Sequence, residues 1–272
     1  MPKRFGVGAR EYKSFCQTCQ NKMGDGLHGY YQWASAGIVS AEEIKIAMDS
    51  MDERDYNEQY GGLWETTSGA VYYAFGDDSV ISGEVYDPTR PLMVGSDFNV
   101  DPMAWVLAQS PSGKDVVVID EIWERNTNTQ RTLDLLWERY GNHVGGWYFF
   151  GDASGRSRKT SASMSDYLQI RNDARFDGAK VFYPRSNPPV ADRVATVNWS
   201  LRARSGLRTL KIHERCVHLR NDLQYLAYKA GSREIDDRDP DAGHIADALG
   251  YIVHQVKPMR VEQDVESQVG IF

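Results

Sequence analysis

Short apolar segments alternate with amphipathic ones from Pro91 onward, and this alternation limits what the chain can fold into more than any other feature. Apolar runs of strand length predict β-strands, and longer stretches with apolar residues three or four positions apart predict helices. The predicted strands are residues 92–98, 105–108, 116–123, 147–152, 180–183 and 210–213, and the predicted helices are residues 127–140, 165–175, 190–203, 217–229 and 244–256. Three successive strands, a helix and then alternating strands and helices predict an α/β fold, with a mixed central β-sheet flanked by helices.

The first quarter of the chain has a different pattern. Glycines punctuate residues 1–39, which predicts loops or irregular structure. Ser40 followed by Glu43 forms a capping-box pattern, so we expect a helix over residues 40–51. A second helix is predicted over residues 53–63 and a β-hairpin over residues 68–75. We expect this part to be an extension of the main domain, or a piece of a neighbouring one.

The charge of the chain is distributed unevenly. The 272 residues include 31 Lys and Arg against 38 Asp and Glu, a net charge of −7 that argues against a simple basic DNA-coating protein. Residues 155–233 contain 16 basic and 6 acidic residues, which gives +10, whereas the rest of the chain carries −17. The basic segment offers a phosphate-binding surface, or else a solvated surface that the acidic flanks neutralise on folding.

The sequence lacks the features typical of membrane-spanning proteins, secreted proteins and structural zinc sites. No apolar run reaches the roughly 20 residues of a membrane helix, and no signal-peptide core follows the first charges. Three cysteines cannot all pair within one chain, which favours a reducing, intracellular compartment. Cys16 and Cys19 have zinc-like spacing, but His28 is the only nearby further ligand and Cys216 is remote. We therefore expect free cysteines and no zinc.

Three acidic residues follow or interrupt apolar segments, where a core sequence does not favour them. Asp97 and Asp152 each follow an apolar strand, and Asp247 lies between apolar neighbours in the last helix. His244 lies three residues before Asp247, on the same face of that helix. Each acid alone also fits a turn or capping role. Together, two strand-end carboxylates and one helical carboxylate suit Mg²⁺ or Mn²⁺, and two such ions can promote phosphodiester cleavage.

Three motifs occur in an order that resembles a known family. They are Gly95-Ser96-Asp97-Phe98-Asn99 with Asp101-Pro102, then Gly151-Asp152-Ala153-Ser154-Gly155, then His244-Ile245-Ala246-Asp247-Ala248-Leu249-Gly250-Tyr251. In this order they resemble the nuclease domain of the large terminase subunit of tailed bacteriophages, a member of the RNase H-like superfamily. The resemblance covers about residues 80–257. More weakly, residues 1–75 resemble the segment that closes the terminase ATPase domain and leads into the nuclease.

The resemblance implies an activity and a set of site residues. Asp97 would lie in the middle of the first strand, Asp152 at the end of the neighbouring strand and Asp247 on the C-terminal helix, all three as catalytic metal ligands. His244 matches a position where some relatives place a metal-site histidine, and it could equally be an ordinary residue of the helix N-terminus. The residues expected to support the ligands are Asn99, Ser154 and Glu121. The implied activity is two-metal, Mg²⁺- or Mn²⁺-dependent endonucleolytic cleavage of concatemeric double-stranded DNA.

Basic residues that follow Asp152 in the sequence are candidates for DNA contacts. Those expected to reach phosphates are Arg156, Arg158 and Lys159 directly after it, and Arg185 and Arg204 further along. Arg193 would either extend this track or cover a helix surface. By resemblance, the protein partners are the terminase ATPase domain, the small terminase subunit and the portal protein, and the location is the cytoplasm of the infected bacterial host.

One departure from a complete large terminase is evident. The phosphate-cradling Gly-x-x-x-x-Gly-Lys-Ser/Thr loop is not found, since Gly113-Lys114 is followed by Asp115. We therefore expect no nucleotide cofactor, and expect residues 1–79 to be an extension from the ATPase junction, 80–258 the nuclease domain and 259–272 a tail. Such a chain would be the C-terminal part of a larger protein or a split gene product. Two alternatives stay open, a junction resolvase of the same superfamily and a non-catalytic docking module of the packaging motor.

Overall fold

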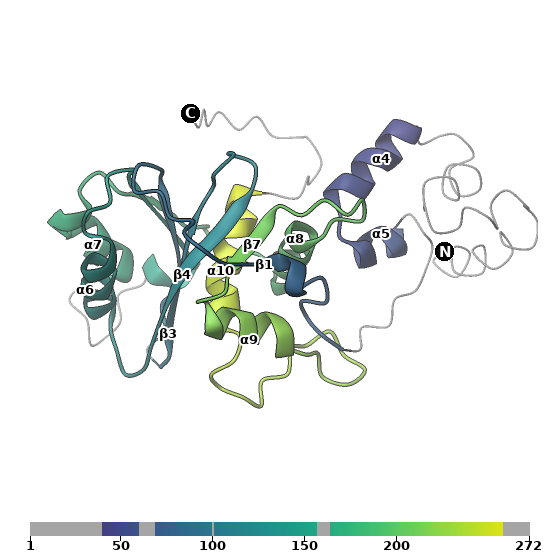
Figure 1. The fold of residues 1–272 in the computed structure, drawn as a ribbon. Coiled ribbons are helices and arrows are strands. Elements are labelled where there is room, and N and C mark those ends of the chain that lie inside the picture. Colours follow the sequence, from purple (N-terminus) through teal and green to yellow (C-terminus); the bar gives the residue numbers. More distant parts are fainter. Residues whose placement is uncertain (1–39, 60–68, 100, 157–163, 258–272) are drawn as a thin grey trace, which may run out of the picture.

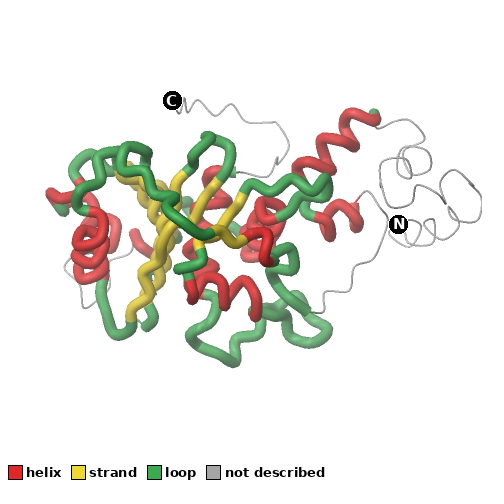
Figure 2. The backbone as a smooth tube through the Cα atoms, viewed as in Figure 1, coloured by secondary structure: helices red, strands yellow, loops and turns green. Residues whose placement is uncertain are grey.

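A computed structural model describes residues 40–59, 69–99, 101–156 and 164–257, and a mixed β-sheet forms the centre of this part of the chain (Figures 1 and 2). The seven strands found in these ranges are β1 (Val80–Ile81), β2 (Leu92–Asp97), β3 (Met103–Gln109), β4 (Val116–Glu124), β5 (Trp147–Gly151), β6 (Lys180–Phe182) and β7 (Leu210–His213). Their order across the sheet is β1-β7-β4-β3-β2-β5-β6. Strands β2, β3 and β4 form an antiparallel meander, and all other pairings are parallel.

Helices cover both faces of the sheet, as the alternation of elements predicted. In Figure 1, α6 and α7 lie on one side of the strands and α8, α9 and α10 on the other. Their bounds are α6 (Thr129–Tyr140), α7 (Asp166–Asn172), α8 (Val190–Leu201), α9 (Val217–Tyr225) and α10 (His244–Val256). The predicted mixed sheet flanked by helices is therefore confirmed.

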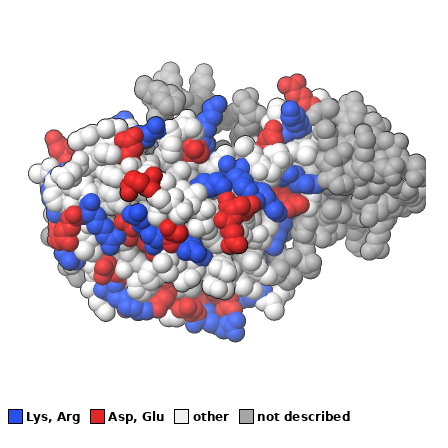
Figure 3. Space-filling model, in the orientation of Figure 1, with Lys and Arg blue, Asp and Glu red and all other residues white. Residues whose placement is uncertain are grey.

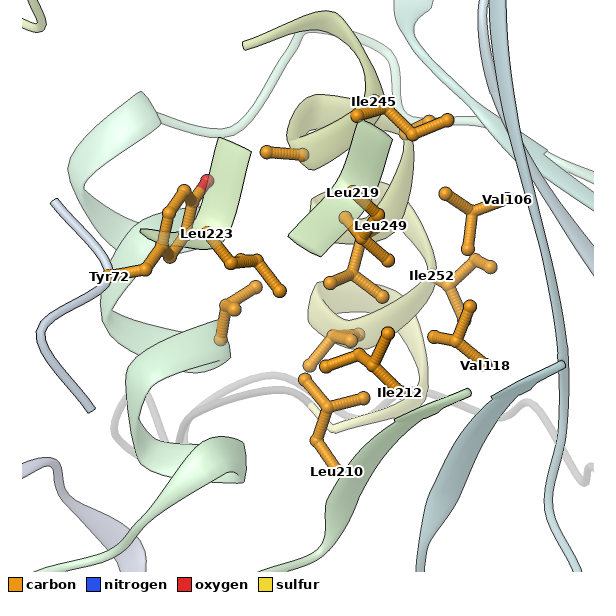
Figure 4. Packing of buried hydrophobic residues seen from close by; sticks show 14 of the residues in the cluster. Tyr72, Val106, Val118, Leu210, Ile212, Leu219, Leu223, Ile245, Leu249 and Ile252 are labelled. Atoms are coloured by element: carbon orange, nitrogen blue, oxygen red, sulfur yellow. The ribbon is translucent and has the colours of Figure 1, made fainter. Parts of the chain in front are cut away.

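Each face of the sheet has its own hydrophobic core, because side chains alternate along the strands. Leu92 and Val94 of β2 belong to the core under α6 and α7, whereas Met93 belongs to the core under α8, α9 and α10. Figure 4 shows the second core, in which Leu249 and Ile252 of α10 lie among side chains from α9 and the strands.

Helix α10 contacts the sheet most closely at Gly95. A Cβ atom built on Gly95 would lie 2.2 Å from the carbonyl oxygen of Ala248 and within 3 Å of the Ile252 side chain. Only a residue without a side chain allows this approach. As a result, the N-terminal end of α10 lies beside the carboxyl end of β2.

The described residues before the sheet form two helices and a turn. Helix α4 (Ala41–Ser50) begins with the predicted capping box, in which the Ser40 hydroxyl accepts from the backbone N–H of Glu43 and the Glu43 carboxylate accepts from that of Ser40. Helix α5 (Glu53–Gln59) follows. The end of the predicted second helix, residues 60–63, lies outside the described residues, as do residues 1–39 with Cys16 and Cys19, and the predicted tail.

The predicted β-hairpin over residues 68–75 is wrong for the residues that the structure describes. Ala70 instead forms an isolated antiparallel bridge with Ala227, and residues 71–74 form a turn. The turn is held at long range, because Asn198 of α8 donates to the Val71 carbonyl and accepts from the Ala74 N–H. Val71 is fully buried in the core under α8, α9 and α10.

The Asp101–Pro102 peptide bond between β2 and β3 is cis. Within the described part of the chain, no helix has both the length and the apolar composition needed to span a membrane.

We expect Gly95→Ala to destabilise the fold by at least about 2 kcal/mol, because the added methyl group overlaps the backbone of α10. Urea unfolding followed by circular dichroism measures the change. Gly250→Ala is the matched control, because its Cβ would lie 3.5 Å from the nearest side-chain atom, an ordinary contact inside a helix. Equal stability of the two variants would contradict the close approach described for Gly95.

Candidate metal centre

Two of the predicted ligands lie next to each other at the carboxyl ends of neighbouring parallel strands. Asp97 is the last residue of β2, and Asp152 directly follows β5. The residues before them, Ser96 and Gly151, are partners in the register of these two strands. Parallel strands lie about 4.8 Å apart, so the two carboxylates start from adjacent positions at one edge. Asp97 thus ends its strand, and the expectation that it lies mid-strand is corrected.

The first turn of α10 brings His244 to Asp97. The Nδ1 atom of His244 lies 2.8 Å from Oδ2 of Asp97, and its Nε2 atom lies 3.0 Å from the carbonyl oxygen of Pro240. The hydrogen bond to Asp97 raises the pKa of His244 above its usual value, against the lowering effect of burial. Because both ring nitrogens face acceptor oxygens, the surroundings favour the protonated imidazole.

Asp247, one turn further along α10, is half-buried and paired with an arginine. Nη1 of Arg193, on α8, donates to Oδ1 of Asp247 over 2.7 Å. Burial raises the pKa of Asp247, the charge of Arg193 lowers it, and the charge of Asp97 raises it again. The negative charge of Asp97 is therefore close enough to act on Asp247.

The hydroxyl of Tyr251 lies within electrostatic range of all three acids. Burial raises the pKa of Tyr251, and the negative charges of Asp247, Asp152 and Asp97 raise it further, whereas Arg193 lowers it. We call these three acids the carboxylate triad. The fold brings the triad together from two strands and one helix that are more than 50 residues apart in sequence.

Each member of the triad has one oxygen bound by a donor of the protein. The donors are His244 for Asp97, the Gly155 backbone N–H for Asp152 at 3.2 Å, and Arg193 for Asp247. The other oxygen of each carboxylate accepts no hydrogen bond from the residues that the structure describes. As they stand, no three His, Cys, Asp or Glu side chains in the described ranges form a complete metal-binding cluster. The donor set nevertheless fits Mg²⁺ or Mn²⁺ in its chemistry, because each of the three carboxylates keeps one oxygen that accepts no hydrogen bond from the described residues.

The start of α10 is fixed by a buried acid of α9. Gly243, just before α10, has a left-handed backbone with φ of 93° and offers no side chain as a cap. Instead, Oδ2 of Asp222 accepts from the backbone N–H groups of Gly243 (2.9 Å) and Ala246 (3.3 Å). This contact holds the helix end that carries His244 and Asp247.

The residues predicted to support the ligands lie in different parts of the structure. Nδ2 of Asn99 lies 3.4 Å from Nε2 of His244, so Asn99 reaches the site. Ser154 is exposed in the short 3-10 helix that follows Asp152. Glu121 is engaged elsewhere, which corrects its expected role: its two carboxylate oxygens accept from the backbone of α9's first turn, at 2.8 and 2.9 Å.

The predicted DNA-contacting residues are also separated. Arg156 and Arg185 lie together beside Asp152, since Nη2 of Arg156 donates to the Arg185 carbonyl over 2.8 Å. Arg204 lies elsewhere: its guanidinium is 3.9 Å from the carboxylate of Glu53 and 5.9 Å from the ring centre of Tyr56. It packs α5 against the loop after α8, which corrects its expected place in a DNA track. Arg158 and Lys159 lie outside the described residues.

A cavity of about 640 Å³ reaches the site from the side of α5. His244 and Asp247 are in its wall, whereas Asp97 and Asp152 are not. Several acids line it as well, among them Asp52, Asp236 and Asp239. Arg54 and Arg233 line it too, so its wall carries both signs of charge with acids in excess.

The sequence interpretation missed Arg193 and Asp222 as parts of the site. The sequence suggests for Arg193 either a place in a DNA-contacting track or cover of a helix surface, and neither of these is a contact with Asp247. Its spacing from Val197 and Leu201, four residues at each step, was the available signal, because it places Arg193 on the buried stripe of α8. Asp222 similarly precedes the buried Leu223 on α9.

Comparisons with known proteins agree with the motifs at the level of fold. No family model matches the sequence, and a search of curated proteins gives no significant match. Among solved structures, the large terminase from a thermophilic bacteriophage matches with a TM-score of 0.59 and 18% identity, over 80% of this chain and 52% of that chain. The P22 large terminase nuclease domain matches with a TM-score of 0.52 and 11% identity, over 71% of this chain and 95% of that domain.

These matches define the class of fold. The chain has the RNase H-like fold of large terminase nuclease domains, as its three motifs predicted. It spans about half the length of the large terminase from the thermophilic phage.

Burial raises the pKa of Asp222 to about 6, and this predicts a pH dependence of stability. The raised pKa means that the fold favours the protonated acid: its contribution is complete below about pH 4 and is lost as the pH rises through 6. Between pH 4 and pH 7 we expect the wild type to lose about 2 kcal/mol more stability than Asp222→Asn, which has no proton to release. Urea unfolding of both proteins at several pH values, with a metal chelator present, gives the difference. Parallel pH profiles for the two proteins would refute it.

Proposed function

We propose that the chain is the nuclease part of a phage large terminase, a metal-dependent endonuclease that cuts concatemeric double-stranded DNA. The observation that carries the proposal is the carboxylate triad: Asp97 and Asp152 stand at the ends of neighbouring strands, Asp247 stands in the first turns of α10, and each keeps one oxygen without a hydrogen-bond donor among the described residues. The terminase nuclease fold supports it. A junction resolvase or a docking module could share this fold, but a docking module has no need of three such oxygens.

In this proposal the residues of the chain have distinct roles. Asp97, Asp152 and Asp247 would hold Mg²⁺ or Mn²⁺, with two ions expected. Bound divalent cations would supply charge stabilisation for in-line displacement at phosphorus. His244 and Arg193 orient the carboxylates of Asp97 and Asp247, and no nucleotide or zinc is required.

The basic side chains nearest the triad would position the DNA backbone. Arg156 is exposed beside Asp152, and it is held by the carbonyl oxygens of Ala153 and Arg185. The face seen in Figure 3 shows Lys and Arg interspersed with Asp and Glu rather than forming one continuous basic track. Contacts to phosphates position DNA without reading its bases, so we expect low sequence selectivity.

The partners and the location that we propose are inferred from the similarity in fold to terminase nucleases. The partners would be a terminase ATPase domain, a small terminase subunit and a portal protein, and the location the cytoplasm of an infected bacterium. Preference for four-way junctions over linear duplex would instead favour the resolvase.

The first test is Asp97→Asn in a plasmid-cleavage assay with Mn²⁺. We expect cleavage to fall at least about a hundredfold, because a neutral amide replaces a charged ligand while keeping the side-chain shape. Asp134→Asn is the control, because Asp134 lies on α6 and pairs with Arg175 away from the triad. Equal cleavage by the wild type and Asp97→Asn would rule out the proposed site.

A second test compares Arg185 with Arg204, because the structure places these two arginines in different regions. We expect Arg185→Ala to weaken binding of a duplex DNA and to lower the slope of log K against log salt by about 1. Arg204→Ala should leave both quantities unchanged, because Arg204 faces Glu53 and Tyr56. Fluorescence anisotropy between roughly 50 and 200 mM salt measures the slopes. A larger effect of Arg204→Ala would reverse the assignment.

A further inference from the structure

Arg193 is a buried arginine held in one position by its neighbours. Its side chain is only 6% exposed, which is rare for a charged group because burial removes its hydration. The side chain lies against Gly250 of α10, and its guanidinium lies over the ring of Tyr251, 4.6 Å from the ring centre. This packing leaves the guanidinium little freedom to move away.

The single ionic partner of Arg193 in the described part of the chain is Asp247. Nη1 binds Oδ1 over 2.7 Å, while the buried Nε atom has no hydrogen-bond partner among the described residues. The Asp247 side chain is 40% exposed, and its other oxygen accepts no hydrogen bond from the described residues. One carboxylate oxygen is therefore committed to a fixed internal cation and the second is available.

The other charged groups near Asp247 differ from Arg193 in position. Asp97 carries the same charge as Asp247, whereas Arg193 carries the opposite charge and is bonded to it directly. His244 is bonded to Asp97 rather than to Asp247. Among these groups Arg193 alone both touches Asp247 and opposes its negative charge.

We propose that Arg193 is a positioning residue of the metal centre: it fixes Asp247 through Oδ1, so that a divalent cation is bound through Oδ2 alone, and its charge weakens that binding. The inference rests on the proposed function, because it concerns the same site. A fixed carboxylate keeps one ligand geometry, which favours cleavage, whereas a positive charge nearby disfavours a second cation. Arg193 therefore has two opposing effects. It holds Asp247 in an orientation that favours cleavage, and its charge lowers the affinity of the site for the cation.

This opposition gives Arg193→Met a distinctive expected outcome. The substitution removes the charge and keeps a long apolar side chain against Gly250 and Tyr251. We expect Mn²⁺ to bind about tenfold more tightly, because one charge at this distance shifts the affinity of a carboxylate for a cation by about that factor. We expect kcat for plasmid cleavage to fall about tenfold or more, because Asp247 loses its fixed orientation. A merely structural role would weaken both.

The experiment measures Mn²⁺ binding by isothermal titration calorimetry, and plasmid cleavage, on the full chain. The wild type is compared with Arg193→Met, Arg193→Lys and Asp97→Asn, and with Arg131→Met, which removes an exposed arginine of α6 paired with Glu138. Circular dichroism shows whether each variant is folded. Arg193→Lys keeps the charge, so we expect Mn²⁺ affinity within about threefold of the wild type and slower cleavage. Arg131→Met should match the wild type in both assays.

The outcomes separate this inference from the proposed function. If the wild type binds no Mn²⁺, or binds it no better than Asp97→Asn does, the proposed function fails. If the wild type binds Mn²⁺ but Arg193→Met binds it equally or more weakly, the inference about Arg193 is overturned. Should Arg193→Met be unfolded, Arg193→Lys decides: loss of Mn²⁺ binding, or unchanged cleavage, overturns the inference, whereas retained binding with slower cleavage supports it.

Discussion

The close contact between α10 and β2 at Gly95 is the constraint on which the candidate site depends. It lets the backbone of the helix lie directly against the strand, where a side chain would overlap the Ala248 carbonyl. Through this contact the first turn of α10 reaches the carboxyl end of the sheet. His244 and Asp247 therefore meet residues of β2 and β5, although more than 90 residues separate α10 from β5.

The elements that could be predicted are those whose cause is local. Apolar runs and helical spacing gave six of the strands in the described ranges, and the Ser40–Glu43 pair gave the start of α4. The three acids could be singled out because an acid beside a buried strand needs a special reason, and their role as metal ligands stays a prediction. The turn at residues 71–74 was not, because Asn198, more than 120 residues away, holds it. Arg193 and Glu121 likewise have partners that are distant in the sequence: Arg193 binds Asp247 of α10, and Glu121 accepts from the backbone of α9.

Part of the positive charge of residues 155–233 is paired within the fold, so the sum of charges does not by itself predict a DNA surface. Several of its basic side chains form ion pairs within the chain. Examples are Arg175 with Asp173, Arg193 with Asp247, Arg202 with Glu53, Arg208 with Asp78 and Lys229 with Asp237. The net charge summed along the sequence therefore overstates the positive charge available to a binding partner. The basic side chains beside Asp152 are a better guide to DNA binding than this sum.

The strand order also predicts which backbone amides near the site are protected from exchange with solvent. The two edge strands, β1 and β6, have two and three residues, whereas β2 and β5 have paired neighbours on both sides. Short edges offer few free backbone groups to another chain. Fraying begins at such edges and at exposed loops, and interior strands open only in larger unfolding events. The amides of β2 next to Asp97 should therefore exchange with solvent among the slowest in the molecule, which would keep this ligand in place while peripheral segments fluctuate.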